Sequence, residues 1–195
     1  MSISPSEKVL VSIEDGIATL RINNPAANTW DLESLPALEA VVNNLNGMAE
    51  VRALVITGQG AKFFSAGADL NQFADGDPIA AGAMGEAFGA AFETLADYRG
   101  VSIAAINGYA MGGGLEVALA CDIRIAESHA ALALPEAKVG LLPCAGGTQR
   151  LAQLVGEGWA KRIMLCGERV SAEKAMTLGL VEEVVASGTS LAAAI

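Results

Sequence analysis

Hydrophobic and polar residues alternate along the first part of the chain, at residues 9–13 and again at residues 17–22. This two-residue period is typical of strands with one buried face. The pair Asp15-Gly16 between them is a strong signal for a tight hairpin turn. Apolar residues then recur with helical spacing over residues 32–45, where Pro36 is expected to make the first turn irregular. The pattern predicts a β-hairpin followed by an amphipathic helix.

Short apolar runs and helical patterns alternate along the rest of the chain. Strands are expected at residues 51–57, 101–106, 123–126, 131–134 and 181–185, and helices at residues 79–98, 115–121, 158–166 and 172–178, with another helix opened by the glycine pair of AGGTQRL (145–151). Ser171 and Gly179 suit the two ends of the helix at 172–178. This alternation indicates an α/β fold with a mostly parallel sheet. Because the chain shows no repeats and no low-complexity linker, a single domain over residues 1–195 is expected.

Three successive glycines, residues 112–114, separate the apolar strand at 101–106 from the helix at 115–121. Glycines leave the backbone bare, and the first N–H groups of a helix have no partner within it. Such a turn is a ready site for an anion or a developing negative charge, and Glu116 follows two residues later. The alternative is structural: glycines also permit tight packing, and the helix dipole favours an acid in the first turn. The common phosphate motifs do not fit, because GxGxxG would need glycine at Val117 and a P-loop would need lysine at Gly114.

A second stretch of small residues lies at 65–68, directly after Phe63 and Phe64. The two aromatic residues are interpreted as core anchors, and the small residues leave room for a ligand to approach the backbone. Asp69 comes next, where it could equally cap a helical turn.

Composition narrows the possible partners. The chain has 195 residues, of which 52% are hydrophobic, and this is enough for one domain with a real core. Its formal net charge of -10 argues against nucleic acid as a partner, although a phosphorylated small ligand needs only a local patch of positive charge. The single histidine, His129, makes a histidine triad or a histidine-based metal site improbable. It is interpreted as a surface or packing residue, and no metal is expected.

The cysteines and the N-terminal residues indicate the cellular compartment. The three cysteines are odd in number and form no CxxC pair, which fits buried free thiols in a reducing compartment. The first residues, MSISPSEK, contain no apolar signal-peptide region. The longest uncharged run is too short and too rich in glycine to span a membrane. A cytoplasmic protein without membrane contact is therefore expected.

Three motifs in this order carry a resemblance to a known family: SAGADL (65–70), INGYAMGGGLEVALACD (106–122) and LPEAKVGLLPCAGGTQRL (134–151). Together they resemble the crotonase superfamily, and specifically its enoyl-CoA hydratases. The resemblance implies a crotonase-like fold of ββα turns around a spiral, with surrounding helices. It also implies an oxyanion hole made by the backbone N–H groups of Ala68 and Gly113, which would stabilise the negative charge that a thioester carbonyl gains as its enolate forms.

The resemblance assigns the catalytic carboxylates to Glu116 and Glu136. With both present, the implied reaction adds water across a trans-2-enoyl-CoA to give a 3-hydroxyacyl-CoA, in fatty-acid or branched acyl-CoA breakdown. Glu116 would help to activate the water, and Glu136 would exchange the proton at the α-carbon. No cofactor is implied, since coenzyme A is part of the substrate. Taken alone, Glu136 is also consistent with a loop or helix-start acid after Pro135.

Coenzyme A contacts and assembly are implied by the same resemblance. The residues expected to bind coenzyme A are Ala26, Ala27, Ala66, Ala68, Asp69 and Leu70. Lys62 is a further candidate for a phosphate contact. Members of the family form trimers or dimers of trimers, so a homo-trimer or hexamer is expected.

Departures from the family pattern add three expectations. Ser102 stands where relatives usually have proline, which predicts a looser turn. Cys144 replaces a small residue such as glycine, and it would either narrow the pocket or act as a passive small hydrophobic group. The chain stops at Ile195, so the family's usual C-terminal helices are expected to be lacking.

Two other classes of function remain open at this point. The first is another crotonase enzyme, namely an enoyl-CoA isomerase or a decarboxylase. The second is a non-catalytic acyl-CoA-binding subunit. The presence of both Glu116 and Glu136 favours the hydratase over the second class.

Overall fold

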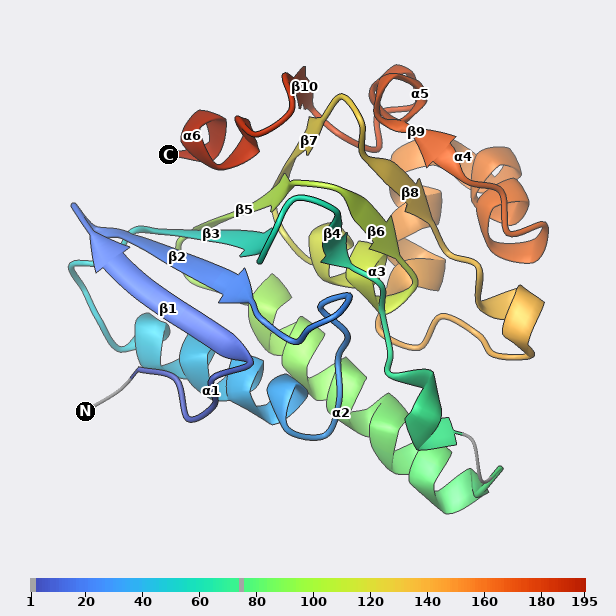
Figure 1. Cartoon of the computed structure of the whole chain (residues 1–195), viewed down its shortest axis with the longest axis horizontal. Coiled ribbons are helices and arrows are strands. Elements are labelled where there is room, and N and C mark those ends of the chain that lie inside the picture. The colour runs from blue at the N-terminus through green and yellow to red at the C-terminus, as the bar shows by residue number, and fades with distance from the viewer. Residues whose placement is uncertain (1–2, 74–75) are drawn as a thin grey trace.

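The computed structural model describes residues 3–73 and 76–195 (Figure 1). Its larger sheet has six strands in the order β1-β2-β3-β5-β7-β10. β1 runs antiparallel to β2, and the other neighbouring pairs run parallel, which confirms the predicted mostly parallel sheet. The strands are β1 Val9–Glu14, β2 Ile17–Ile22, β3 Ala53–Gly58, β5 Val101–Ile106, β7 Ile123–Glu127 and β10 Glu183–Val185.

The predicted hairpin is confirmed. Glu14 pairs with Ile17 across a two-residue turn, and Asp15 and Gly16 both have positive φ angles, of 49° and 81°. Turns of this kind match the twist of the strands that they join. The alternation in β2 is also borne out, because Ala18, Leu20 and Ile22 are fully buried while the residues between them are only half-buried.

A second sheet of four very short strands was not predicted as a sheet. Its order is β4-β6-β8-β9, with β4, β6 and β8 parallel and β9 antiparallel to β8. The strands are β4 Phe63–Ser65, β6 Tyr109–Met111, β8 Ala131–Ala133 and β9 Val170–Ser171. Only the extended stretch at 131–134 was expected, because strands of two or three residues are too short to show a hydrophobic period.

Three consecutive ββα units build the molecule, and each places one strand in each sheet before a helix. The helices are α2 Pro78–Ala96, α3 Gly113–Leu119 and α4 Gly147–Leu165. This repeated unit confirms the expected crotonase-like spiral of ββα turns. Since β4, β6 and β8 are parallel neighbours, the three segments that follow them leave the small sheet at one edge. That edge brings together residues 66–69, 112–114 and 134–136.

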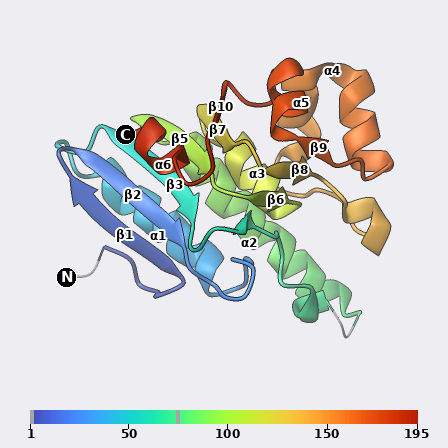
Figure 2. The same ribbon diagram turned by 45° about the horizontal axis from the view of Figure 1, so that its top comes forward.

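Both faces of the larger sheet are covered. Helices α1 Ser34–Asn46 and α2 pack on one face, and the short helix α6 Ser190–Ala194 packs on the other (Figures 1 and 2). Along β3, Leu54 and Ile56 belong to the main core, whereas Val55 joins a smaller cluster that includes Ala194 of α6. Burial on both faces explains why the central strands β3 and β5 are mostly apolar.

Several helix boundaries differ from the expectation. α1 begins at Ser34 rather than at residue 32, so Pro36 falls in the first turn, where its missing N–H breaks no helical hydrogen bond. The two helices expected around 147–166 form one element, α4, interrupted at Gly156, where φ is 76° and ψ is 160°. The helix at 172–178 is α5 Ala172–Thr177, and the Ser171 hydroxyl caps it by accepting from the N–H of Lys174 at 3.3 Å. α6 was not predicted. Within the described part of the chain, no helix has the length and apolarity needed to cross a membrane.

Three smaller expectations are corrected. Only Cys121 is a buried thiol, since Cys144 and Cys166 are exposed. Phe64 is a fully buried anchor, but Phe63 is only half-buried. The turn at Ser102 is not loose, because the Ser102 N–H and hydroxyl both donate to one carboxylate oxygen of Asp122 at 2.8 Å.

Candidate active site

A cavity of about 490 Å³ opens where the three segments leave the small sheet. Glu116, Glu136, Ala68 and Gly113 all line it, so the structure brings together the four residues expected to carry out catalysis. The other lining residues are Thr29, Ala66, Leu70, Phe73, Ala81, Gly85, Phe88, Gly112, Pro135, Lys138, Val139, Leu141, Leu142 and Cys144. Most of this wall is apolar, and among the described residues that line it the charged side chains are those of Glu116, Glu136 and Lys138.

The segment after β4 presents a backbone N–H group at Ala68. The N–H of Trp30 donates to the Gly67 carbonyl at 2.8 Å, and the Trp30 carbonyl accepts from the N–H of Asp69 at 2.9 Å. This parallel bridge uses the groups on either side of Ala68, so the N–H of Ala68 points away from Trp30. Among the hydrogen bonds of residues 3–73 and 76–195, none is donated by this N–H.

The turn after β6 presents a second N–H group at Gly113. Gly112 has a φ of 55° and a ψ of -128°, a conformation that requires glycine. Its N–H donates to the Ala133 carbonyl at 2.9 Å, which fixes the turn against β8. Gly113 is the first residue of α3, so its N–H has no partner within the helix. A Cβ added to Gly67 would lie 3.0 Å from the Gly113 nitrogen, which shows how closely the two loops approach each other.

Glu116 lies in the first turn of α3 and is 2% exposed. Its Oε1 atom accepts from the N–H of Ala145 at 2.8 Å and from the N–H of Gly147 at 2.9 Å. Burial raises the pKa of Glu116 above its ordinary value, although the N–H groups of Gly147, Ala145 and Cys144 work against this. Gly147 leaves the space for this carboxylate, because a Cβ there would lie 2.7 Å from Oε1.

Glu136 begins the 3₁₀ turn η2 Glu136–Val139 that follows β8 and Pro135. Burial raises its pKa from 4.5 to about 7, and the nearby Glu116 carboxylate adds to this rise. Its Oε2 atom is buried and has no hydrogen-bond partner among the described residues. The other oxygen, Oε1, lies over Gly112, where an added Cβ would be 3.1 Å from it. A buried carboxyl group with so few partners favours its protonated form.

Residues expected to bind coenzyme A fall into two groups. Ala66, Ala68 and Leu70 line the cavity, whereas Ala26, Ala27 and Asp69 do not. Ala27 instead supports the cavity wall, since its carbonyl accepts from the N–H of Ala66 at 3.0 Å. The carboxylate of Asp69 accepts from the N–H and side-chain amide of Asn71, so it caps the 3₁₀ turn η1 Leu70–Phe73, which was the alternative role considered for it.

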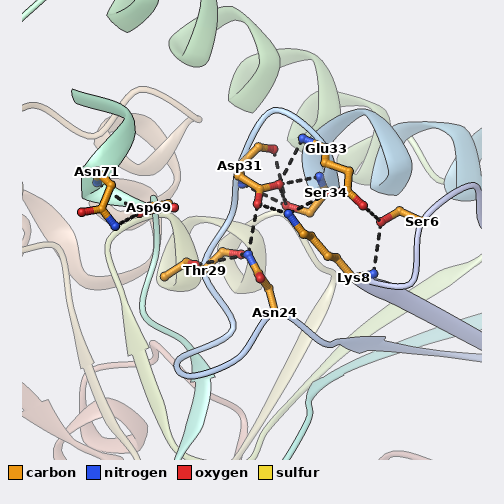
Figure 3. A network of polar contacts seen from close by, with 9 residues as sticks. All are labelled: Ser6, Lys8, Asn24, Thr29, Asp31, Glu33, Ser34, Asp69 and Asn71. Atoms are coloured by element: carbon orange, nitrogen blue, oxygen red, sulfur yellow. Dashed lines mark hydrogen bonds and ion pairs between the residues drawn. The ribbon is translucent and has the colours of Figure 1, made fainter. Parts of the chain in front are cut away.

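A buried carboxylate anchors the loop that contains Trp30. The Asp31 side chain accepts from Lys8 Nζ at 2.6 Å, from the Ser34 N–H at 2.8 Å and from Asn24 Nδ2 at 3.2 Å (Figure 3). Burial alone would raise the pKa of Asp31, but the hydrogen bonds from Lys8 and Ser34 outweigh it and the pKa is lowered. The loop between β2 and α1 is therefore held at several points.

Some residues around the cavity were not singled out from the sequence. Phe88, on α2, packs against Gly113, where an added Cβ would lie 2.6 Å from its ring. Trp30 and Asp31 position the Ala68 segment. A local signal existed for Asp31, because it is a good helix-capping residue just before the predicted helix. Phe88 follows the helical period of apolar residues in α2, with Met84 and Phe92, but no sequence period points to Trp30.

Cys144 was recognised from the sequence as a departure, and it lines the cavity. Partial desolvation beside the cavity, together with the neighbouring carboxylates of Glu116 and Glu136, raises the pKa of its thiol to about 11. The thiol is therefore neutral near pH 7. This supports the interpretation of Cys144 as a passive small group in the cavity wall.

His129 lies away from the cavity, on the exposed surface. Its Nδ1 is 2.8 Å from the Ser187 hydroxyl, and its Nε2 is 3.2 Å from the Ala61 carbonyl. It is thus a surface residue, as expected, and its ring nitrogens contact two segments that are distant in the chain. Within residues 3–73 and 76–195, no cluster of three or more His, Cys, Asp or Glu residues is arranged to hold a metal ion.

Comparisons with known proteins agree on one family. A family model described as "Enoyl-CoA hydratase/isomerase" matches residues 12–195. The Short-chain-enoyl-CoA hydratase of Clostridium acetobutylicum is 38% identical over 178 residues, which cover 91% of this chain and 68% of that protein. The structure of Pseudomonas aeruginosa DspI is similar with a TM-score of 0.96 and 63% identity, over 97% of this chain and 78% of that one. An enoyl-CoA hydratase from Bacillus anthracis gives a TM-score of 0.93 at 36% identity, over 96% of this chain and 74% of that one.

Proposed function

The chain belongs to the enoyl-CoA hydratase/isomerase family, and from this premise we propose that it is a hydro-lyase that adds water across the double bond of a trans-2-enoyl-CoA. The product is a 3-hydroxyacyl-CoA. The observation that supports this reaction most strongly is the shared cavity, in which two carboxyl groups meet two backbone N–H groups that have no acceptor among the described residues. Hydration needs both parts, because water must be activated and negative charge must be stabilised.

The two N–H groups act on the thioester carbonyl. We place its oxygen between the N–H groups of Ala68 and Gly113, where it accepts from both. When water attacks C3, electrons move from the double bond through C2 toward this oxygen, and an enolate forms. Donors that are already oriented stabilise the enolate without reorganising, and losing one such donor typically costs about 3 kcal/mol of barrier.

The two carboxyl groups divide the proton transfers. Glu116 is the anionic base: two N–H groups hold its Oε1 atom, and Oε2 accepts the hydrogen bond of the attacking water. As the C–O bond forms at C3, the proton of that water passes to Glu116. Glu136 enters protonated and gives its proton to C2, which completes the addition. A net proton return from Glu116 to Glu136 restores the starting state. The raised pKa of Glu136, about 7, suits this donor role near neutral pH.

Turnover of crotonyl-CoA by the purified chain tests the proposal. Hydration removes the conjugated double bond, so the enoyl absorbance falls, and mass spectrometry of the product shows the gain of one water. A product of unchanged mass with a shifted double bond would instead identify an isomerase. Tight binding of crotonyl-CoA without any turnover would point to a non-catalytic acyl-CoA-binding subunit. Either result would overturn the hydratase proposal.

The proposal extends to assembly, compartment and cofactor use. Large apolar residues such as Ile79 and Leu142, which are 80% and 75% exposed, are consistent with a homo-trimer or hexamer. The three cysteines are free, which fits the reducing cytoplasm. The proposed chemistry requires no cofactor, because each proton transfer has a carboxyl group to carry it. Sedimentation of the purified chain as a monomer would contradict the oligomer.

A further inference from the structure

Trp30 is fully buried although it lies in the loop between β2 and α1. Its backbone makes the two hydrogen bonds that flank Ala68, at 2.8 Å to the Gly67 carbonyl and at 2.9 Å from the Asp69 N–H. A shift of the Trp30 backbone would therefore carry the Ala68 segment with it. The neighbouring Asp31 carboxylate ties the same loop to Lys8 and to the start of α1 (Figure 3).

Two other aromatic rings, those of Phe92 and Phe88, connect the indole ring of Trp30 to the turn that carries the Gly113 N–H. The centre of the indole ring is 5.8 Å from the ring of Phe92 at an angle of 74°, and Phe92 is 5.5 Å from Phe88 at 83°. Both contacts are edge-to-face, the arrangement that aromatic pairs favour. Phe88 in turn packs directly against the Cα atom of Gly113. A continuous row of rings thus runs from Trp30 to the turn that carries the Gly113 N–H.

We propose that Trp30 is a positioning residue that holds both oxyanion donors in place, Ala68 through its backbone and Gly113 through the row of rings. This inference rests on the proposed function, because it assigns a role within the same oxyanion hole. Trp30 is fully buried and is not among the residues that line the cavity, so its role is indirect. Its effect is geometric: displacing a group in an active site by about 1 Å can cost roughly 10²-fold in rate.

The surroundings of the indole nitrogen show whether Trp30 acts through the shape of its side chain or through a hydrogen bond. Nε1 of Trp30 is buried and has no hydrogen-bond partner among the described residues. An unpaired buried donor costs stability, so the residue is used here for its size and its aromatic face. Phenylalanine should therefore replace it well, whereas leucine should not, because leucine cannot make the edge-to-face contact with Phe92.

Steady-state kinetics of Trp30→Leu and Trp30→Phe test the proposal. We expect Trp30→Leu to lower kcat for crotonyl-CoA by about 10- to 100-fold, with KM changed by less than about three-fold, and Trp30→Phe to stay within about three-fold of the parent. Trp159→Leu is the matched control. Trp159 is half-buried on α4 beside Arg162 and Lys174 and is not among the cavity-lining residues. The kcat of Trp159→Leu should equal that of the parent. A folded Trp30→Leu enzyme with parental kcat would overturn the proposal.

A spectroscopic signature makes the test independent of turnover. The absorption band of bound cinnamoyl-CoA, a chromophoric enoyl thioester, moves to longer wavelength when hydrogen bonds polarise its carbonyl. The parent and Trp30→Phe should both show this shift, and it should shrink in Trp30→Leu at saturating ligand. If Trp30→Leu does not fold, Phe92→Leu breaks the same row one ring later and should give the same loss. An undiminished shift in the folded variant refutes the positioning role. A parent that shows the shift but does not hydrate refutes only the proposed function.

Discussion

Glu116 and Glu136 are the same kind of side chain in two different surroundings. Two backbone N–H groups stabilise the anion of Glu116, whereas one buried oxygen of Glu136 has no partner. Burial raises the pKa of both groups, and that of Glu136 reaches about 7. A pair of carboxyl groups whose surroundings differ in this way is suited to separate acid and base roles.

Replacing either carboxyl group by an amide should slow hydration strongly. Glu116→Gln and Glu136→Gln should each lower kcat for crotonyl-CoA by about 10²- to 10⁴-fold, because a positioned acid or base typically contributes that much. Since both groups serve the same addition and act as a unit, the double variant should lose much less than the product of the two single losses. Binding of crotonyl-CoA should persist, because backbone groups hold the carbonyl. Steady-state kinetics and a separate binding measurement check both points.

Glu86→Gln is the control for these variants. Glu86 is an exposed glutamate on α2, and its amide form should keep parental kcat. If Glu116→Gln keeps near-parental kcat while Glu136→Gln is inactive, only one of the two carboxyl groups is essential. Such a result would contradict the two-carboxylate hydration mechanism and favour an isomerase.

The rate should depend on pH in opposite ways in the two directions. Hydration needs Glu136 protonated, so kcat/KM for crotonyl-CoA should fall as the pH rises through about 7, where burial has placed its pKa. Dehydration of 3-hydroxybutyryl-CoA needs the same group ionised, so its kcat/KM should rise over that range. Both profiles, measured at constant ionic strength, should lose this step in Glu136→Gln. Parallel profiles for the two directions would rule out Glu136 as the proton carrier.

The sequence predicted the individual catalytic groups that lie within a motif, but not the residues that hold those groups in place. Ala68, Gly113, Glu116 and Glu136 lie in short stretches whose residue order is distinctive, and the cavity brings all four together. Trp30 acts through contacts with segments distant in the chain, and no local pattern encodes such contacts. The raised pKa of Glu136 was equally hidden, because it depends on burial in the folded molecule.

Among the secondary-structure elements, α3 can pack this close to the small sheet because residue 114 is glycine. A Cβ on Gly114 would lie 2.1 Å from the carbonyl oxygen of Ser65 in β4, and a backbone atom cannot move aside as a side chain can. Gly114→Ala should therefore lower the free energy of unfolding by about 1–3 kcal/mol, the usual cost of overpacking. It should also lower kcat, since the preceding residue, Gly113, carries a proposed oxyanion donor. Urea unfolding and crotonyl-CoA kinetics measure the two effects.

The same substitution in α2 should have the opposite sign. Gly82 is exposed in that helix, and no atom lies within 4 Å of a Cβ added there. Gly82→Ala should raise the free energy of unfolding by about 0.5–1 kcal/mol, because alanine loses less conformational entropy in a helix. Equal effects of the alanine substitution on the free energy of unfolding at the two positions would show that helix propensity, rather than contact with β4, determines the result at Gly114.

Element length decided which parts of the fold could be predicted. Strands and helices with several residues on a buried face, such as Ile17–Ile22 and Val101–Ile106, gave clear patterns. The small sheet did not, because its strands have two or three residues. Yet this sheet positions the site, since the loops after β4, β6 and β8 all line the cavity. The resemblance to a known family supplied the spiral that local patterns could not.

For the whole molecule, charge is the property that acts at long range. The chain carries a formal net charge of -10, and coenzyme A brings several negative phosphate charges to it. Their mutual repulsion slows association and weakens binding, and salt screens it over a Debye length of about 10 Å at 0.1 M. Only local cations can oppose this repulsion. Lys138 lines the cavity, and the exposed Lys62 lies beside Phe63 of β4, with its Nζ atom 5.2 Å from the ring centre.

Added salt should therefore help the enzyme rather than inhibit it. We expect kcat/KM for crotonyl-CoA to rise several-fold as the ionic strength increases from about 0.02 to 0.3 M, because the repulsion between protein and substrate is screened. Crotonyl-pantetheine, which has the same thioester but no phosphates, is the matched control, and its kcat/KM should stay constant. If kcat/KM for crotonyl-CoA instead falls with salt, local attraction outweighs the net charge. Lys62→Gln and Lys138→Gln would then show which cation binds the phosphates, because the responsible variant should abolish that fall.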